Sequence, residues 1–128
     1  MNILVIEDHP SELKLANHVL TAAGHQVNGL EAADTALETI YQNRPDLIVL
    51  DMQLPGMDSL DLVRSLKSDP LTAQIIIVAV TSFPETYPKA KAIKAGCDAY
   101  IVKPLSTRTL PNDLDVILHA QGSRPNPQ

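Results

Sequence analysis

Residues 47–56 read LIVLDMQLPG, an apolar run that ends on an acidic side chain and turns at once. The apolar part has the length and composition of a buried strand, so the carboxylate of Asp51 should protrude from the rim of a sheet. Three other short apolar runs also end abruptly on polar residues. These are Glu7 and Asp8 after residues 3–6, Thr81 after residues 75–80, and Lys103 after residues 101–102. Because parallel strands have their carboxyl ends at one edge of a sheet, the sequence predicts that these side chains meet.

The composition is that of one ordinary globular domain. The chain has 128 residues, of which 45% are hydrophobic and 20% are charged, and this length is enough to bury a core. Its net charge of −5 argues against direct binding of nucleic acid, because an acidic chain does not attract a phosphate backbone. The single cysteine, Cys97, cannot form an intrachain disulfide, and the longest apolar run is far shorter than the roughly 20 residues that cross a bilayer. We therefore expect a cytoplasmic protein without a membrane partner.

Short apolar runs alternate with segments of helical periodicity five times along the chain. This alternation predicts an α/β fold, a doubly wound five-stranded parallel sheet with five flanking helices. The expected strands are residues 2–6, 26–29, 46–50, 75–80 and 99–102. In the flavodoxin-like arrangement of such a sheet the strand order is 2-1-3-4-5, and ligands bind where strands one and three end.

The expected helices have recognisable ends. Gly24 closes the first helix, Asp58 caps the start of the third, and Gly96 stops a short fourth helix over residues 89–95. Pro111 predicts that the fifth helix begins late or kinks. The segment 121–128 has two prolines and no apolar residue, so we expect one domain over residues 1–120 and a flexible tail or linker stub over residues 121–128.

The acidic residues expected at the edge of the sheet need a counter-charge. Adjacent strands lie about 4.8 Å apart, so Glu7, Asp8 and Asp51 would repel one another. Mg²⁺ would relieve this repulsion, since it binds one or two protein carboxylates beside phosphate oxygens. The flexible stem of Lys103 could bring its ammonium over the same site, and Thr81 could donate a hydrogen bond to a phosphoryl oxygen. An attacking aspartate, a metal, a lysine and a hydroxyl indicate phosphoryl transfer to a carboxylate.

Four segments together resemble the receiver domain of CheY-like response regulators, the modules of two-component signal transduction. They are VIED at residues 5–8, Asp51 followed by LPGMD at residues 54–58, AVTS at residues 79–82 and YIVKP at residues 100–104. The resemblance covers roughly residues 2–120 and keeps the family's order and spacing. Each motif alone is a weak signal, whereas four in register are specific.

The resemblance implies that a histidine kinase or a histidine phosphotransfer protein donates a phosphoryl group to Asp51. It also implies that Asp8, Asp51 and the main-chain carbonyl of Gln53 hold Mg²⁺, while Glu7 acts mostly through bound water and Lys103 neutralises phosphoryl charge. The expected protein is thus a phosphoprotein of a phosphorelay. It is a signalling module that catalyses its own phosphorylation and dephosphorylation, and not a conventional enzyme.

The resemblance further implies that Thr81 and Tyr100 form a switch. The hydroxyl would move toward phosphoaspartate and the aromatic ring would turn inward, which would reshape the surface of the fourth helix, fifth strand and fifth helix. That surface would meet a downstream protein or a covalently linked output domain. The Lys103–Pro104 peptide bond is expected to be cis, as in the family.

Several positions depart from the family's commonest pattern, among them Pro84 and Pro88, which make the loop after Thr81 stiffer, and Pro111, which disturbs the fifth helix. Ser59 stands where the family often has glycine, at the start of the third helix. Phe83 lies two residues after Thr81, where the family varies the side chain that tunes the access of water. A bulky ring at this position is expected to slow hydrolysis.

Alternative readings fit parts of the pattern. Phosphatases and phosphotransferases that resemble haloacid dehalogenases need a second acid two residues after the nucleophile, and that position is Gln53. A receiver-like scaffold that works without phosphate would not need the five pocket residues that the chain retains, which are Glu7, Asp8, Asp51, Thr81 and Lys103. His9 could suggest a transition-metal ligand, but it has no second histidine at ligand spacing, so we expect it to face solvent.

Overall fold

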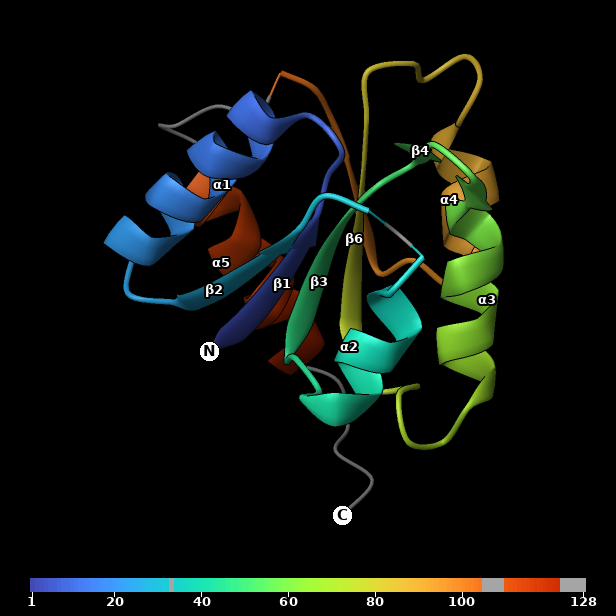
Figure 1. The fold of residues 1–128 in the computed structure, drawn as a ribbon, viewed down its shortest axis with the longest axis horizontal. Coiled ribbons are helices and arrows are strands. Elements are labelled where there is room, and N and C mark those ends of the chain that lie inside the picture. Colours follow the sequence, from blue (N-terminus) through green and yellow to red (C-terminus); the bar gives the residue numbers. More distant parts are fainter. Residues whose placement is uncertain (33, 105–109, 123–128) are drawn as a thin grey trace.

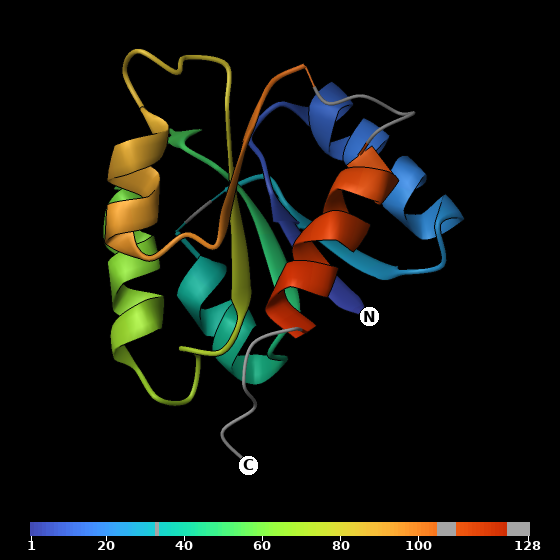
Figure 2. The same ribbon diagram turned by 180° about the vertical axis from the view of Figure 1, so that it is seen from behind.

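The computed structural model describes residues 1–32, 34–104 and 110–122. Its centre is a five-stranded sheet in which every pairing is parallel, with the order β2-β1-β3-β6-β7 (Figures 1 and 2). The strands are β1 (Asn2–Ile6), β2 (Gln26–Leu30), β3 (Leu47–Asp51), β6 (Ile76–Thr81) and β7 (Ala99–Val102). Numbered among themselves these strands lie in the order 2-1-3-4-5, so the predicted doubly wound sheet is confirmed.

In the described part of the chain, five helices cover the two faces of this sheet. They are α1 (Pro10–Ala22), α2 (Ala36–Gln42), α3 (Ser59–Ser68), α4 (Lys89–Ala95) and α5 (Leu110–Gly122). Helices α2, α3 and α4 share one buried apolar cluster with the sheet, and α1 and α5 share the other, as Figures 1 and 2 show from opposite sides. None of these helices is long and apolar enough to cross a membrane.

Strand β3 lies at the centre of the sheet and is buried on both faces. Ile48 and Leu50 join the apolar cluster beneath α2, α3 and α4, whereas Leu47 and Val49 join the cluster beneath α1 and α5. A strand that is covered on both sides reads as a continuous apolar run, which explains its sequence. The last residue of the strand, Asp51, is therefore carried on the most deeply buried strand of the sheet.

The ends of the helices follow local rules of capping. Asp58 precedes α3, and its Oδ1 accepts a hydrogen bond from the main-chain N–H of Leu60 at 2.9 Å, which satisfies a free donor of the first turn. Helix α4 begins after Pro88 and ends before Gly96, as predicted. Gly96 has a φ of 123°, a backbone conformation that glycine adopts without steric cost.

Three strands end one residue later than the sequence predicted: β2 on Leu30, β3 on Asp51 and β6 on Thr81. β3 and β6 also begin one residue later. The reason is that the ladder continues to these ends, since Leu30 pairs with Ile6, Asp51 with Val80 and Thr81 with Val102. A short antiparallel hairpin of β4 (Gln53–Leu54) and β5 (Met57–Asp58) then follows β3, and the sequence analysis did not anticipate it.

The C-terminal helix fits the constraint set by proline. Pro111 is the second residue of α5, and in the first turn of a helix its missing N–H removes no hydrogen bond. The helix runs to Gly122 and so includes the first two residues of the expected tail. The rest of that tail, residues 123–128, lies outside the described residues.

Truncation of the core should be costly where a side chain is fully enclosed. Leu66 of α3 has no exposed surface, whereas Leu71 is 61% exposed. We expect Leu66→Ala to lower the free energy of unfolding by about 2–5 kcal/mol, because it leaves a cavity. The matched change Leu71→Ala should alter this free energy by less than about 0.5 kcal/mol. Urea denaturation followed by circular dichroism measures both, and equal effects would contradict the packing described.

Candidate phosphoacceptor and metal site

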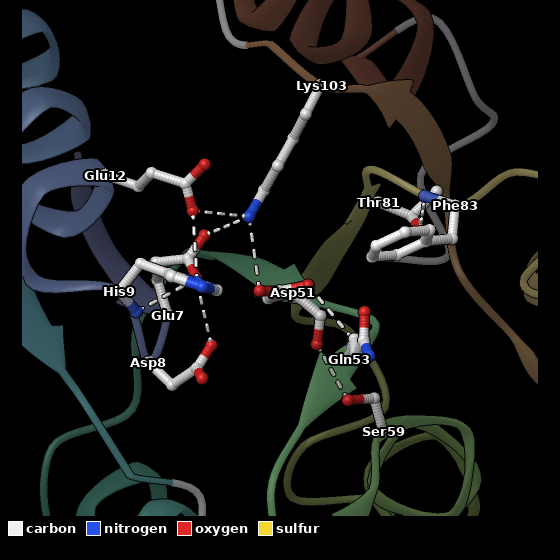
Figure 3. A network of polar contacts seen from close by, with 10 residues as sticks. All are labelled: Glu7, Asp8, His9, Glu12, Asp51, Gln53, Ser59, Thr81, Phe83 and Lys103. Carbon is white, nitrogen blue, oxygen red and sulfur yellow. Dashed lines mark hydrogen bonds and ion pairs between the residues drawn. The ribbon is translucent and has the colours of Figure 1, made fainter.

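The carboxyl ends of β1 and β3 bring the predicted acidic residues together (Figure 3). The parallel register of the two strands places Glu7 and Asp51 at the same edge of the sheet. One ligand atom from each of Glu7, Asp8, His9 and Asp51 lies within 4.8 Å of the others. Glu7 and Asp51 are only 5% and 4% exposed, so two carboxyl groups share a site with little access to water.

Lys103 follows β7, and β6 separates β7 from β3, yet its side chain reaches over the acids (Figure 3). Its Nζ donates hydrogen bonds to Glu7, to Glu12 at 2.9 Å and to Asp51 at 3.2 Å. Burial disfavours the charged ammonium, but the hydrogen bonds to Glu7 and Glu12 and the charge of Asp51 outweigh this effect and raise the pKa of Lys103. The ammonium therefore stays charged at neutral pH. The Lys103–Pro104 peptide bond is cis.

Each oxygen of Asp51 has a defined partner. Oδ2 accepts the hydrogen bond from Lys103, and Oδ1 accepts one from the main-chain N–H of Gln53 at 3.0 Å. The main-chain oxygen of Asp51 accepts a hydrogen bond from the hydroxyl of Ser59 at 2.7 Å. Ser59, which the sequence marked only as a departure from glycine, is the buried first residue of α3. It therefore joins the start of that helix to the backbone that carries Asp51.

The pKa of Glu7 is raised to about 7. Burial is the largest cause, the hydrogen bond and negative charge of Asp51 act in the same direction, and Lys103 opposes them. Desolvation and a neighbouring like charge both disfavour an ionised carboxylate. Near neutral pH, a proton and a cation therefore compete for Glu7.

His9 and Glu12 belong to the site, although the sequence analysis did not assign them to it. Nδ1 of His9 lies 3.3 Å from carboxylate oxygens of Glu7, Asp8 and Glu12, while its side chain is 63% exposed. The hydrogen bond with Glu7 and the charge of Asp8 raise the pKa of His9. Burial would raise the pKa of Glu12, but the hydrogen bond from Lys103 and the positive charges of Lys103 and His9 together outweigh it and lower this pKa. The sequence places Glu12 in the first turn of the helix that follows Glu7 and Asp8, which was the available signal that it lies near the site. Only the structure shows that the side chain of Lys103 reaches it.

The predicted switch residues, Thr81 and Tyr100, make different contacts. Thr81 ends β6 and is fully buried, and its hydroxyl oxygen accepts a hydrogen bond from the main-chain N–H of Phe83 at 2.9 Å. Tyr100 of β7 is half-buried, and its hydroxyl donates a hydrogen bond to the main-chain oxygen of Tyr87 at 2.6 Å. Thr81 thus lies at the same edge of the sheet as Asp51, whereas Tyr100 contacts the segment before α4. Their movement stays a prediction.

The donor atoms of the site suit a hard divalent cation. Oδ1 of Asp8 is buried and accepts no hydrogen bond within the described residues, although Nδ1 of His9 lies 3.3 Å away. Such an anionic oxygen is costly to bury unless a cation compensates it, and oxygen ligands are those that Mg²⁺ prefers. Gln53 adjoins the site because its main-chain N–H donates a hydrogen bond to Asp51. The role of its main-chain carbonyl as a ligand of Mg²⁺ stays a prediction.

The fold and the site together define a class of protein. It is a doubly wound α/β domain that presents an aspartate, an acidic cluster and a lysine at the switch point of its sheet. The family model of the response regulator receiver domain matches residues 3–115. The chain therefore belongs to the receiver domain family of two-component response regulators. As a family, these domains bind Mg²⁺ in an acidic pocket and interact with histidine kinases and downstream effectors.

Similar proteins include both short and long response regulators. The chain is 37% identical to the polar-differentiation response regulator DivK of Brucella anthropi, over 82% of this chain and 85% of that protein. It is 35% identical to the phosphate regulon transcriptional regulatory protein PhoB of Pseudomonas aeruginosa, over 94% of this chain and 52% of that protein. Among solved structures, a CheY-like receiver domain protein from Methanospirillum hungatei superposes with a TM-score of 0.86 at 25% identity, covering 97% of this chain and 98% of that one.

The affinity for Mg²⁺ should depend on pH through Glu7. Because the pKa of Glu7 is raised to about 7, this group holds a proton in metal-free protein at lower pH, and the metal must displace that proton. We expect the dissociation constant to rise by up to roughly tenfold for each pH unit below 7 and to be nearly constant above pH 8. Isothermal titration calorimetry in buffers of different ionisation enthalpy measures the affinity and counts the protons released.

The control for this prediction is Glu7→Gln, which keeps the shape of the side chain and removes its titration. This variant should show a smaller change of Mg²⁺ affinity between pH 6 and pH 8 than the unaltered protein, and the remaining change should disappear when His9, whose pKa is also raised, is replaced by glutamine as well. Equal affinities of the unaltered protein at these two pH values would contradict the raised pKa of Glu7.

Proposed function

We propose that Asp51 accepts a phosphoryl group from the phosphohistidine of a histidine kinase or a histidine phosphotransfer protein, in a reaction that depends on Mg²⁺. The observation that carries this proposal is the contact of 3.2 Å between the buried carboxylate of Asp51 and Nζ of Lys103, beside the acidic cluster. A nucleophile and a cation so placed meet the main requirement of phosphoryl transfer, which is positioning with charge stabilisation. Membership of the receiver domain family supports the same role.

In this reaction an oxygen of Asp51 attacks phosphorus. A new O–P bond forms as the P–N bond of the donor breaks, and the donor's imidazole leaves with its bonding electrons. Lys103 places a positive charge where the transferred group gathers negative charge, and the N–H of Gln53 holds the second carboxylate oxygen in position. The acidic cluster would hold Mg²⁺, which would supply positive charge to neutralise the phosphoryl oxygens.

We propose that the same site returns Asp51 to its free state by hydrolysis. Water would attack the phosphoryl group, and the carboxylate would leave. This makes the protein a catalyst of its own modification, with a lifetime set by how readily water reaches the phosphorus. Phe83 is 48% exposed and follows Thr81 by two residues at the edge of the sheet where Asp51 lies, so we propose that its ring lines that path.

We propose that Thr81 and Tyr100 carry the phosphorylation signal to the surface of α4, β7 and α5. Thr81 is fully buried at the end of β6, the strand that pairs with β3. A phosphoryl group on Asp51 would therefore be within reach of the hydroxyl of Thr81. Among the described residues, that surface exposes apolar side chains of each element, namely Ile93, Val102 and Val116. One relative is matched over 85% of its length, which supports a separate partner protein. Another is matched over only 52% of its length, which supports a covalently linked output domain.

Phosphorylation by a small donor tests the assignment of Asp51. Incubation with Mg²⁺ and acetyl phosphate or phosphoramidate should add the mass of one phosphoryl group, because the proposed site activates its own nucleophile. Intact-mass spectrometry should show the adduct in the unaltered protein, no adduct in Asp51→Asn, and at least about tenfold slower formation in Lys103→Met. Chelation of Mg²⁺ should also abolish it.

The outcomes separate the proposed function from its alternatives. An adduct that persists in Asp51→Asn would place the phosphoacceptor elsewhere. No adduct with either donor, in correctly folded protein, would overturn the proposal and favour a scaffold that works without phosphate. Steady turnover of a small phosphoester would indicate a phosphatase instead.

The ring of Phe83 should lengthen the life of phosphoaspartate. After removal of the donor, the adduct should decay several-fold faster in Phe83→Ala, because the smaller side chain opens a path for water; a change of about 1 kcal/mol in the barrier gives a factor of about five. Intact mass recorded over time measures the decay. Ile93→Ala, which shortens another exposed apolar side chain, is the matched control, and equal decay in both variants would contradict the role of the ring.

A further inference from the structure

Lys103 has no hydrogen bond to spare for a phosphoryl group. Its ammonium has three N–H donors, and these are directed to Glu7, to Glu12 at 2.9 Å and to Asp51 at 3.2 Å. To bind a phosphoryl oxygen on Asp51, the ammonium must give up at least one of these acceptors. The identity of that acceptor decides how easily the site is phosphorylated.

Glu12 is the acceptor that differs from the other two. Glu7 and Asp51 lie in the buried acidic cluster, with side chains 6% and 5% exposed, whereas the side chain of Glu12 is 41% exposed. Its carboxylate comes from the first turn of α1 and lies beside the ammonium of Lys103, as Figure 3 shows. Water can take the place of Lys103 at Glu12, so this hydrogen bond is the one of the three whose loss leaves no buried group unpaired.

We propose that Glu12 is a positioning residue that occupies Lys103 in the unphosphorylated protein and thereby slows phosphorylation of Asp51. This inference rests on the proposed function. The carboxylate of Glu12 holds the N–H that a phosphoryl oxygen would otherwise bind, and its negative charge at the mouth of the site repels an anionic donor. Both effects hinder the reaction, while Glu7 and Asp51 suffice to keep the buried ammonium in place.

Substitution of Glu12 should therefore accelerate phosphorylation. With Mg²⁺ and acetyl phosphate, Glu12→Gln should form the adduct on Asp51 about three- to tenfold faster, the range expected when a charge-assisted hydrogen bond becomes a neutral one, because the amide oxygen of glutamine can still accept from Lys103. Glu38→Gln removes the same charge from the exposed face of α2 and should leave the rate unchanged. An unchanged or slower rate in Glu12→Gln would overturn the inference.

A shorter acid separates the hydrogen bond from the charge. Glu12→Asp keeps the negative charge but withdraws the carboxylate from Lys103. If Glu12 acts by holding Lys103, the maximal rate at saturating acetyl phosphate should rise in Glu12→Asp as it does in Glu12→Gln. If Glu12→Asp keeps the original maximal rate, the hydrogen bond between Glu12 and Lys103 does not slow phosphorylation and the inference fails.

A double-mutant cycle tests the contact without any phosphorylation. In metal-free protein, Glu12→Gln should lower the Tm more in the presence of Lys103 than in the Lys103→Met background, because the ammonium partner is then absent and, of the described cationic groups, His9 alone remains beside the carboxylate. If the Tm changes of Glu12→Gln and Lys103→Met are strictly additive, and the unaltered protein still forms the adduct on Asp51, this inference is overturned and the proposed function stands. No adduct on any variant, with a clear coupling in the cycle, would instead overturn the proposed function and leave the Glu12–Lys103 contact as a structural one.

Discussion

The site depends on the balance between several carboxylates and one buried ammonium. Two like charges about 4 Å apart repel by roughly 4 kcal/mol at an effective dielectric constant of 20, and the ligand atoms of Glu7, Asp8 and Asp51 lie within 4.8 Å of one another. Lys103 opposes this repulsion through hydrogen bonds to two of these groups. One positive charge cannot neutralise them all, and this explains why the fold leaves a proton on Glu7 or a place for a divalent cation.

Such a balance needs a rigid support, which the central strand provides. All residues of β3 are buried, so the backbone that carries Asp51 is packed from both faces of the sheet. The N–H of Gln53 and the hydroxyl of Ser59 fix the carboxylate and the carbonyl of the same residue. A carboxylate held in this way would lose little entropy on reacting, and its geometry depends on α3 as well as on the sheet.

Much of this arrangement could be predicted because it follows from periodicity and strand ends. Glu7, Asp8 and Asp51 meet because they follow or end two buried strands, β1 and β3, that pair in parallel register. The amino-acid sequence already shows the two apolar runs and the acidic residues at their ends. The hairpin of β4 and β5 was missed because its strands have only two residues each. The contact between Glu12 and Lys103 was missed because it joins residues 91 positions apart through a flexible side chain, a path that no local pattern encodes.

The position of Lys103 directly after the last strand has a consequence for how the protein is made. The acids come from β1 and β3, near the beginning of the chain, whereas the ammonium follows β7, which pairs with β6 at the far edge of the sheet. During synthesis, the early strands would bring carboxylates together well before their counter-charge exists. A chain that stops before β7 would hold an acidic edge without this lysine, so Asp51 gains its ammonium neighbour only when the sheet is complete.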